Sequence, residues 1–284
     1  GVGFQFGDVL DPQALRAAAA GHAFDGVIHL AALKAAGESM EQPARYSRHN
    51  ITGSLNLLEA VLEAGIPSFV FSSSAAVYGD PEYLPLDENH PTRPANYYGY
   101  TKLAIEGFLD WYGRLKGLRH VSLRYFNAAG YDPEGELRGL ERNPANLLPI
   151  VMETAAGMRP RMQVFGDDYA TRDGSCVRDY IHVSDLADAH VRALEYLWGG
   201  GDSLALNLGT GNGTTVKELI TAIETVSGRP MPIKRTERRP GDPPGLVASN
   251  ALAREVLGRD PKHGIDDIIR SAWKWHSTFN GHST

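Results

Sequence analysis

The chain has 284 residues, enough for one large domain or two moderate ones. Hydrophobic residues make up 42% and charged residues 22%, which is ordinary globular usage and excludes disordered, collagen-like and disulfide-stapled chains. The net charge of −6 and the lack of a long basic run exclude nucleic acid as an expected partner. One cysteine, no apolar run of membrane-spanning length and no secretory signal favour the reducing cytoplasm.

The first half of the chain alternates short apolar runs, typical of strands, with helical patterns. Asp11 is a plausible N-cap for the first helix, and Pro12 suits its first position, where a missing N–H costs nothing. This alternation predicts an α/β fold with a doubly wound parallel sheet covered by helices on both faces. The predicted strands are 4–6, 27–30, 68–72 and 121–125, and the predicted helices are 12–20, about 50–64 and 97–115.

The composition changes after Asn127, where Gly and Pro become frequent as far as Pro160. Such a stretch favours loops and short helices that cover a ligand over regular sheet. We therefore expect two domains, 1–129 and a smaller α/β domain at 130–284 with parts packing back on the first. Within the second, the patterns predict a strand at 204–208 and helices near 185–197, 216–226 and 266–275.

Tyr98 and Lys102 lie four residues apart at the start of a predicted helix, so both side chains project from one face. A free phenol has a pKa of about 10, and a nearby ammonium favours the phenolate, so Lys102 is expected to lower the pKa of Tyr98. The spacing is common on solvated helices and is weak by itself. Its context is Ser72-Ser73-Ser74, at the strand end where open α/β sheets bind ligands, although serines there also satisfy loop backbone groups.

Several longer motifs occur together. They are SSSAAVYG at 72–79, YGYTK at 98–102, LRYFN at 123–127, LKAAGES at 33–39, CVRDYIHV at 176–183, NLGTG at 207–211 and RRPGD at 238–242. In this order and over almost the whole chain, they resemble the extended short-chain dehydrogenase/reductase family, and within it the nucleotide-sugar 4-epimerases. The resemblance implies a Rossmann-type cofactor domain followed by a nucleotide-sugar domain.

The resemblance also implies roles for individual residues. Tyr98 is the implied catalytic acid/base, Lys102 lowers its pKa and bonds the nicotinamide ribose, and Ser74 orients the sugar hydroxyl. The positions that match the family's NAD contacts are Asp8, Val9, Ala31, Ala32, Lys34, Asn50, Ser72, Ser73, Tyr98, Lys102 and Tyr125.

The family's nucleotide-sugar contacts map mainly onto the second half of the chain. Arginines suit a diphosphate through bidentate bonds, a carboxylate accepts from ribose hydroxyls, and the phenyl ring matches the uracil position. Leu246 stands where relatives often have Tyr, so we expect some tolerance for UDP-N-acetylhexosamines. The implied substrate residues are Ser74, Asn127, Asn146, Phe165, Arg178, Arg239, Asp242 and Leu246.

The implied reaction interconverts UDP-galactose and UDP-glucose through a 4-keto intermediate, with hydride passing to bound NAD and back. A homodimer through helices at about 50–64 and 100–115 is the family's usual assembly. Two alternatives remain open. One is a nucleotide-sugar 4,6-dehydratase or other extended short-chain dehydrogenase, of which the dehydratase is disfavoured because Ala75-Ala76 follow Ser74 where dehydratases usually have Asp-Glu. The other is a truncated, noncatalytic nucleotide-sugar-binding module.

One family feature has no counterpart in this sequence. The family opens with a strand and a glycine-rich loop that binds the cofactor's pyrophosphate, followed by an acid for the ribose, and Gly1–Phe4 supply neither. If 4–6 is the third strand of a sheet ordered 3-2-1-4-5-6, about 50 residues with its two central strands are missing. We expect an exposed sheet edge and apolar face, and a chain that is part of a longer protein; a remnant that no longer binds cofactor is the alternative.

The cysteine, the histidines and the C-terminal tryptophans give little further indication of function. Cys176 has no second cysteine or base at catalytic spacing and is interpreted as a small loop residue. The ten histidines form no metal-binding pattern such as HExxH, so no metal is expected, and His182 is interpreted as a structural hydrogen-bonding group. Trp273 and Trp275 are expected to be packing residues.

Overall fold

A computed structural model describes residues 2–137, 144, 146–239, 243–258 and 260–278. The chain divides into two compact units. Unit 1 comprises Gly1–Asp80, Asn89–Arg124 and His190–Leu206, and unit 2 comprises Pro81–Glu88, Tyr125–Ala189 and Asn207–Thr284.

Unit 1 is built on a sheet with the strand order β1-β2-β3-β7. The strands are β1 (Val27–His29), β2 (Ser68–Ser74), β3 (Arg119–Tyr125) and β7 (Leu204–Leu208), the last of which ends in unit 2. The helices are α1 (Pro12–Ala20), α2 (Ala36–Glu41), α3 (Pro43–Tyr46), a π-helical turn at Ser47–Thr52, α4 (Gly53–Glu63), a 3₁₀ turn at Ala75–Val77 and α5 (Tyr97–Lys116).

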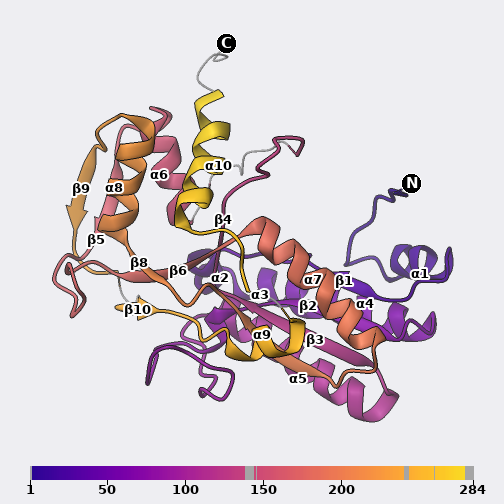
Figure 1. The fold of residues 1–284 in the computed structure, drawn as a ribbon. Coiled ribbons are helices and arrows are strands. Elements are labelled where there is room, and N and C mark those ends of the chain that lie inside the picture. The colour runs from indigo at the N-terminus through magenta and orange to yellow at the C-terminus, as the bar shows by residue number, and fades with distance from the viewer. Residues whose placement is uncertain (1, 138–143, 145, 240–242, 259, 279–284) are drawn as a thin grey trace. The chain divides into compact units, whose positions relative to one another are not determined.

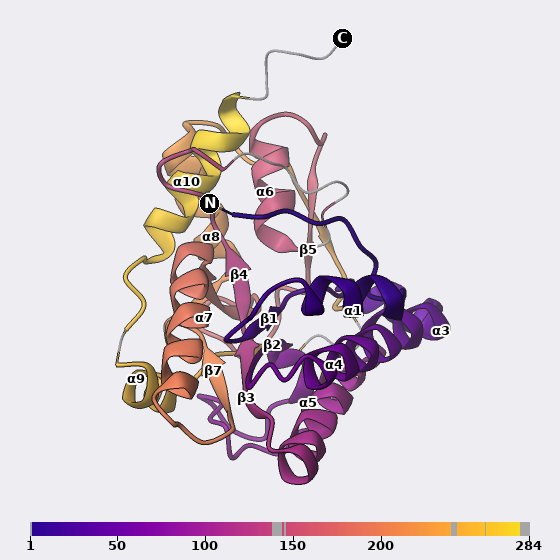
Figure 2. The same ribbon diagram turned by 90° about the vertical axis from the view of Figure 1, so that its right-hand side faces the viewer.

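The unit 1 sheet lies between helices. In Figure 2, α4 and α5 are on one side of β1, β2 and β3, and α7 (Val183–Trp198), which enters unit 1 at His190, is on the other. Leu58, Phe69, Phe71, Ile105 and Leu109 form a core with almost no exposed surface between α4, α5 and β2. Phe69 and Phe71 belong to a strand that is buried along its length, as expected for a parallel strand covered on both faces.

Unit 2 contains shorter strands. They are β4 (Asn127–Ala129), β5 (Met162–Phe165), β6 (Val177–His182), β8 (Gly213–Thr215), β9 (Ile233–Thr236) and β10 (Gly245–Leu246). The helices are α6 (Leu147–Ala155), the first part of α7, α8 (Val216–Ser227), α9 (Ala251–Leu257) and α10 (Ile265–Thr278). Figure 1 shows α6, α8 and α10 side by side, and buried Val151, Ile223 and Ile269 join them in one core.

Most predicted elements are confirmed, including the helix that Asp11 caps: its carboxylate accepts from the N–H groups of Gln13 and Ala14. The prediction of a strand at 4–6 is wrong. Phe4 and Phe6 lie in irregular backbone, and their side chains are more than four-fifths exposed. A strand needs a ladder partner, and none of the described strands pairs with this segment. The expected exposed edge occurs at β1, where the Ile28 side chain is also exposed.

Candidate functional site

Helix α5 positions the acid–base residues of unit 1. It begins at an N-cap, Asn96, whose side chain accepts from Gly99 N at 2.9 Å, so Tyr98 lies in the first turn and Lys102 one turn later. Gly99 brings this turn against the end of β2, because a Cβ there would lie 2.3 Å from the Ala76 carbonyl oxygen. The close approach therefore requires glycine, and it places the helix start beside the serine cluster.

The serine cluster meets α5 at three points. Lys102 Nζ donates to the Ser72 carbonyl at 2.6 Å, and Ser73 Oγ donates to Glu106 Oε1 at 2.5 Å. The side chains of Ser74 and Tyr98 share a hydrogen bond. The structure therefore brings together Ser74, Tyr98 and Lys102, as the prediction of an acid–base site requires.

Burial governs the charges at this site. It raises the pKa of Tyr98, and the hydrogen bond with Ser74 opposes the rise. It lowers the pKa of Lys102 to about 7, against the attraction of Glu106. Lys102 Nζ is 5.9 Å from the centre of the phenol ring, and burial together with the Ser74 hydrogen bond accounts for the shift in the pKa of Tyr98. The expectation that Lys102 lowers this pKa stays a prediction.

The buried ammonium of Lys102 has donors to spare. Only 2% of the residue is exposed, and Ser72 O is the one hydrogen-bond acceptor it finds among the described residues. An ammonium carries three donor hydrogens, so two are left for which the vicinal hydroxyls of a ribose would be acceptors. The donor set of unit 1 thus fits a nicotinamide dinucleotide.

Asn50 organises the loop that follows β1. Its side chain is fully buried, accepts from Leu33 N at 2.8 Å and donates to Leu33 O and Thr101 Oγ1, each at 3.0 Å. Asn50 thereby fixes the chain between Ala31 and Lys34. This loop follows β1, whereas Ser72–Ser73 and Tyr125 lie in the last residues of β2 and β3. Open sheets bind ligands at these strand ends.

Asp8 and Val9 precede α1. Asp8 Oδ1 accepts from Leu10 N at 2.9 Å, which shapes the turn into the helix. The Val9 carbonyl accepts from Asn56 Nδ2 at 3.0 Å, and a Cβ added to Gly53 would collide with the Val9 side chain. These contacts fix the turn on α4 and leave the Asp8 side chain exposed.

In unit 2, three implied substrate residues lie on neighbouring strands of the sheet β10-β6-β4. Leu246 is in register with Arg178, and Asn127 is in register with Tyr180. Because side chains alternate with a period of two, Arg178, Leu246 and Asn127 share one face of this sheet. Asn127 Nδ2 donates to the Asp179 carbonyl at 2.9 Å and is held in place there.

Phe165 and Arg239 also lie together in unit 2. The Arg239 guanidinium stacks over the Phe165 ring at 4.2 Å, so a flat cation and a flat ring meet where the family's nucleotide contacts map. Asn146 is the exposed N-cap residue of α6. Asp242 lies outside the described residues.

Among the buried charged residues that the sequence analysis missed are Glu106, Arg124 and Asp179. Glu106 and Arg124 form a bidentate ion pair at 3.0 and 2.6 Å in unit 1. In unit 2, the Asp179 carboxylate accepts from Thr210 N and Oγ1, Gly211 N and Ala248 N, while burial raises its pKa. The spacing of Tyr98, Lys102 and Glu106 offered a signal for the first, since all three recur every four residues.

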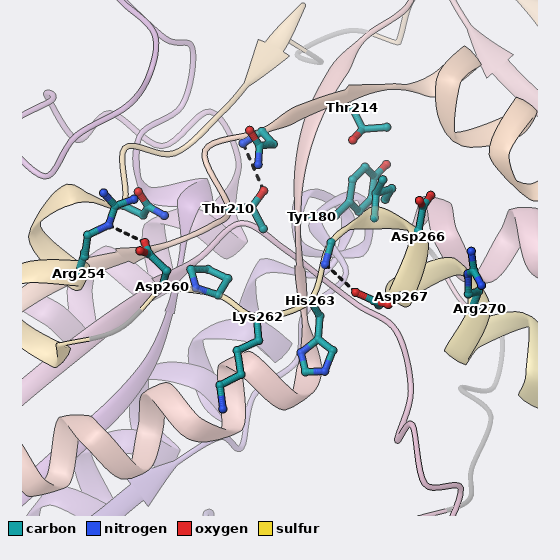
Figure 3. A pocket seen from close by; sticks show the side chains of 15 residues that line it. Tyr180, Thr210, Thr214, Arg254, Asp260, Lys262, His263, Asp266, Asp267 and Arg270 are labelled. Carbon is teal, nitrogen blue, oxygen red and sulfur yellow. Dashed lines mark hydrogen bonds and ion pairs between the residues drawn. The ribbon is translucent and has the colours of Figure 1, made fainter.

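A cavity of about 850 Å³ in unit 2 is lined by none of the predicted site residues. Figure 3 shows its wall, where Arg254 reaches Asp260, and the Gly264 N–H donates to Asp267. Its charged side chains of both signs are mostly exposed. The cavity is therefore distinct from the residues assigned to cofactor and substrate.

Cys176, His182 and Trp273 are all wholly or partly buried. Cys176 is a buried free thiol. His182 is fully buried, accepts from Ser184 N at 3.0 Å and contacts Ser271 Oγ at 3.3 Å, which confirms a structural role. Trp273 packs against the unit 2 core. Within the described part of the chain, no helix has both the length and the apolar character needed to cross a membrane.

Comparison with known proteins agrees with this geometry. Residues 2–209 match the model of the NAD dependent epimerase/dehydratase family. The chain is 52% identical over 276 residues to the UDP-glucose 4-epimerase of Rhizobium leguminosarum bv. trifolii, covering 97% of this chain and 84% of that protein.

Solved structures are similar as well. The UDP-glucose 4-epimerase of Brucella ovis in complex with NAD superposes with a TM-score of 0.93 at 46% identity, over 95% of this chain and 84% of that one. The enzyme of Stenotrophomonas maltophila with bound NAD and formylated UDP-arabinopyranose gives 0.92 at 43% identity, over 96% and 82%.

The parallel sheet and the Ser74-Tyr98-Lys102 site define an enzyme of the nicotinamide-dependent α/β class. The chain belongs to the NAD dependent epimerase/dehydratase family.

Proposed function

We propose that this chain is a UDP-hexose 4-epimerase that interconverts UDP-galactose and UDP-glucose. The observation that carries the proposal is the arrangement of Ser74, Tyr98 and Lys102, in which a partly buried phenol and a buried ammonium lie beside a hydroxyl at the end of β2. The 52% identity to a UDP-glucose 4-epimerase along 97% of the chain supports the choice of substrate.

The residues of unit 1 supply the proton chemistry. Tyr98 takes the proton of the sugar 4-hydroxyl and later returns one, and Ser74 orients that hydroxyl by hydrogen bonding. A bound NAD would supply the hydride acceptor and donor for C4. Lys102 holds a ribose of the cofactor through the two donors that it leaves free and adds positive charge beside the phenol.

The residues of unit 2 are assigned to the nucleotide. Arg178 and Arg239 bind the diphosphate, Phe165 lies against the uracil, and Asn127 with Asn146 supplies amide donors and acceptors. Asp242 accepts from the ribose. Anchoring at the nucleotide leaves the 4-keto sugar free to turn over, so hydride returns to its opposite face and the configuration inverts. In domain terms, unit 1 binds cofactor and unit 2 binds nucleotide sugar.

A 4,6-dehydratase is the nearest rival function. Water elimination needs an acid and a base next to the reacting carbons, and relatives with that activity place them directly after the serine position. Here Ala75 and Ala76 follow Ser74 and begin a 3₁₀ turn. Their methyl groups cannot transfer protons, so the geometry favours epimerisation.

The proposal is tested by incubating the purified protein with UDP-galactose, without added NAD, and measuring UDP-glucose. Conversion that disappears in Tyr98→Phe supports the epimerase. A folded protein that binds UDP-galactose but converts none, with or without NAD, supports the noncatalytic module instead. Formation of a 4-keto-6-deoxy sugar supports the dehydratase.

We also propose that two copies associate through α4 and α5 and that the protein works in the cytoplasm. Trp111 and Leu115 are large apolar side chains on α5, and both are more than half exposed. The single cysteine suits a reducing compartment. Sedimentation equilibrium of the protein and of Trp111→Glu tests the first proposal, and fractionation of the source cells tests the second.

A further inference from the structure

A chain of buried polar side chains continues from the acid–base site into the core of unit 1. Glu106 Oε1 accepts from Ser73 Oγ at 2.5 Å and from Arg124 Nε at 3.0 Å, and Oε2 accepts from Arg124 NH2 at 2.6 Å. Arg124 NH1 in turn donates to the Tyr78 hydroxyl at 2.9 Å, with the guanidinium over the same ring. Glu106 and Arg124 are each less than one-tenth exposed.

This network of side chains holds helix α5 against β2, the strand that carries the serines. Ser73 lies between Ser72, whose carbonyl receives Lys102, and Ser74, which meets Tyr98. Tyr98, Lys102 and Glu106 recur every four residues on α5, so three successive helical turns contact three successive strand residues. Of these three contacts, only that of Glu106 carries a negative charge.

The charge of Glu106 matters because Lys102 is buried. Across from Lys102, β2 presents the Phe71 ring at 4.8 Å and no ionisable group, and β1 presents His29, whose pKa Lys102 and burial hold near 4. Arg124 on β3 is already paired with Glu106. Glu106 is therefore the one described carboxylate that favours the ammonium form of Lys102.

We propose that Glu106 is a positioning residue of the reaction: it fixes Ser73, and with it Ser72 and Ser74, against α5, and it keeps the positive charge on Lys102. Arg124 holds the carboxylate in place through two hydrogen bonds. The proposal rests on the proposed function, because it concerns the competent form of the same Tyr98–Lys102 pair. It adds a residue that does not touch the sugar or the cofactor.

The charge effect has a definite sign. In the proposed mechanism the competent form is the Tyr98 phenolate beside the Lys102 ammonium, which has one proton fewer than the fully protonated pair. Without the negative charge of Glu106, the first of the two protons on Tyr98 and Lys102 is lost at lower pH. The proton that remains then shifts from Lys102 toward the Tyr98 oxygen. Glu106→Gln should therefore shift the acid limb of the kcat profile down by roughly one pH unit. It should also lower the plateau by about tenfold or more.

The matched control is Asp110→Asn, one turn further along α5, where the carboxylate is mostly exposed. It removes the same charge and should leave both the acid limb and the plateau unchanged. Ser73→Ala removes the contact to the strand but keeps the Glu106 charge. It should lower kcat without moving the acid limb. Urea denaturation of each variant, followed by circular dichroism, identifies any that fail to fold.

A second readout does not depend on turnover. The ¹³Cε resonance of Lys102, assigned with Lys102→Arg, reports its protonation directly. We expect it to titrate at lower pH in Glu106→Gln and at the wild-type pH in Asp110→Asn. A wild-type titration in folded Glu106→Gln overturns the proposal. If the Lys102 titration is shifted in Glu106→Gln but the wild-type protein has no epimerase activity, the charge effect of Glu106 stands and the proposed function is refuted.

Discussion

Lys102 Nζ donates a 2.6 Å hydrogen bond to the main-chain carbonyl of Ser72, so a buried ammonium ties helix α5 to the end of strand β2. The contact uses one of three donors and needs no side chain from its partner. It fixes the Lys102 side chain against the end of β2 and leaves two donors for a ligand. The site is thus assembled by a main-chain contact before any substrate binds.

The first prediction concerns Tyr98→Phe. Removing the phenolic oxygen removes the acid/base, so kcat for UDP-galactose should fall by about 10² to 10⁴-fold. The matched control is Tyr100→Phe, two residues on, where the side chain is half exposed and its hydroxyl has no hydrogen bond in the described structure. Coupled assay of UDP-glucose formation measures both. Equal activities for the two variants would count against the assignment of Tyr98.

The second prediction concerns the stability of Lys102→Met. Burial lowers the pKa of Lys102 from 10.5 to about 7, so the unfolded chain binds this proton more tightly than the folded protein does. The contribution of Lys102 to stability therefore decreases as the pH falls, by about 1.4 kcal/mol per pH unit between about pH 10 and about pH 7. Lys102→Met has no titratable group at this position, so it lacks this pH-dependent contribution to stability.

Urea denaturation of the wild type and of Lys102→Met, at about pH 7.5 and about pH 9.5, tests this. The wild type should gain stability relative to the variant at the higher pH, while the variant is inactive at both. A difference in unfolding free energy that stays constant with pH would show that Lys102 is not buried with a lowered pKa.

The third prediction concerns Asp179→Asn. The carboxylate accepts from Thr210, Gly211 and Ala248, and an amide at this position turns one acceptor oxygen into a donor. Leaving buried N–H groups unpaired should cost about 1–3 kcal/mol of unfolding free energy. KM for UDP-galactose should also rise, because Asp179 orders the strand that carries Arg178.

The control for that variant is Asp266→Asn, whose carboxylate is exposed on α10. It should change neither the midpoint of thermal unfolding nor KM. An Asp179→Asn protein that matches this control would show that the four hydrogen bonds contribute little.

The fourth prediction concerns substrate choice at Leu246, which is partly buried and in register with Arg178. Leucine leaves more room than tyrosine, so the protein should turn over UDP-N-acetylgalactosamine as well as UDP-galactose. Leu246→Tyr should reduce kcat/KM for UDP-N-acetylgalactosamine, relative to kcat/KM for UDP-galactose, by about tenfold or more. No detectable use of UDP-N-acetylgalactosamine by the wild type would refute the role of Leu246.

Local sequence signals predicted the elements that carry the acid–base site. The Asp11-Pro12 cap, the helix around Tyr98 and the buried strand ending in serines all appear in the structure, because capping and burial periodicity act over a few residues. The short strands of unit 2 escaped prediction. Strands such as β4 and β10 contain only two or three residues, and cross-strand pairing defines them.

The prediction of a strand at Phe4–Phe6 failed for a related reason. Alternating apolar residues indicate only a preference for extended backbone. A strand forms only where a neighbouring strand hydrogen-bonds its main-chain N–H and C=O groups. The same limit applies to charge. Sequence spacing placed Lys102 beside Tyr98, but it gave no measure of how far burial would raise one pKa and lower the other.

The amino-acid sequence by itself determined the fold class, the family resemblance and the four-residue spacing of Tyr98 and Lys102, since all of these depend on residue identity and local periodicity. Only the tertiary structure decided that Lys102 ends at the Ser72 carbonyl, that Glu106 pairs with Arg124 beneath Ser73, and that Asn50 holds the Leu33 backbone. These contacts join residues 17 to 30 or more positions apart. They form because buried polar groups must find partners wherever the packed sheet and helices bring them.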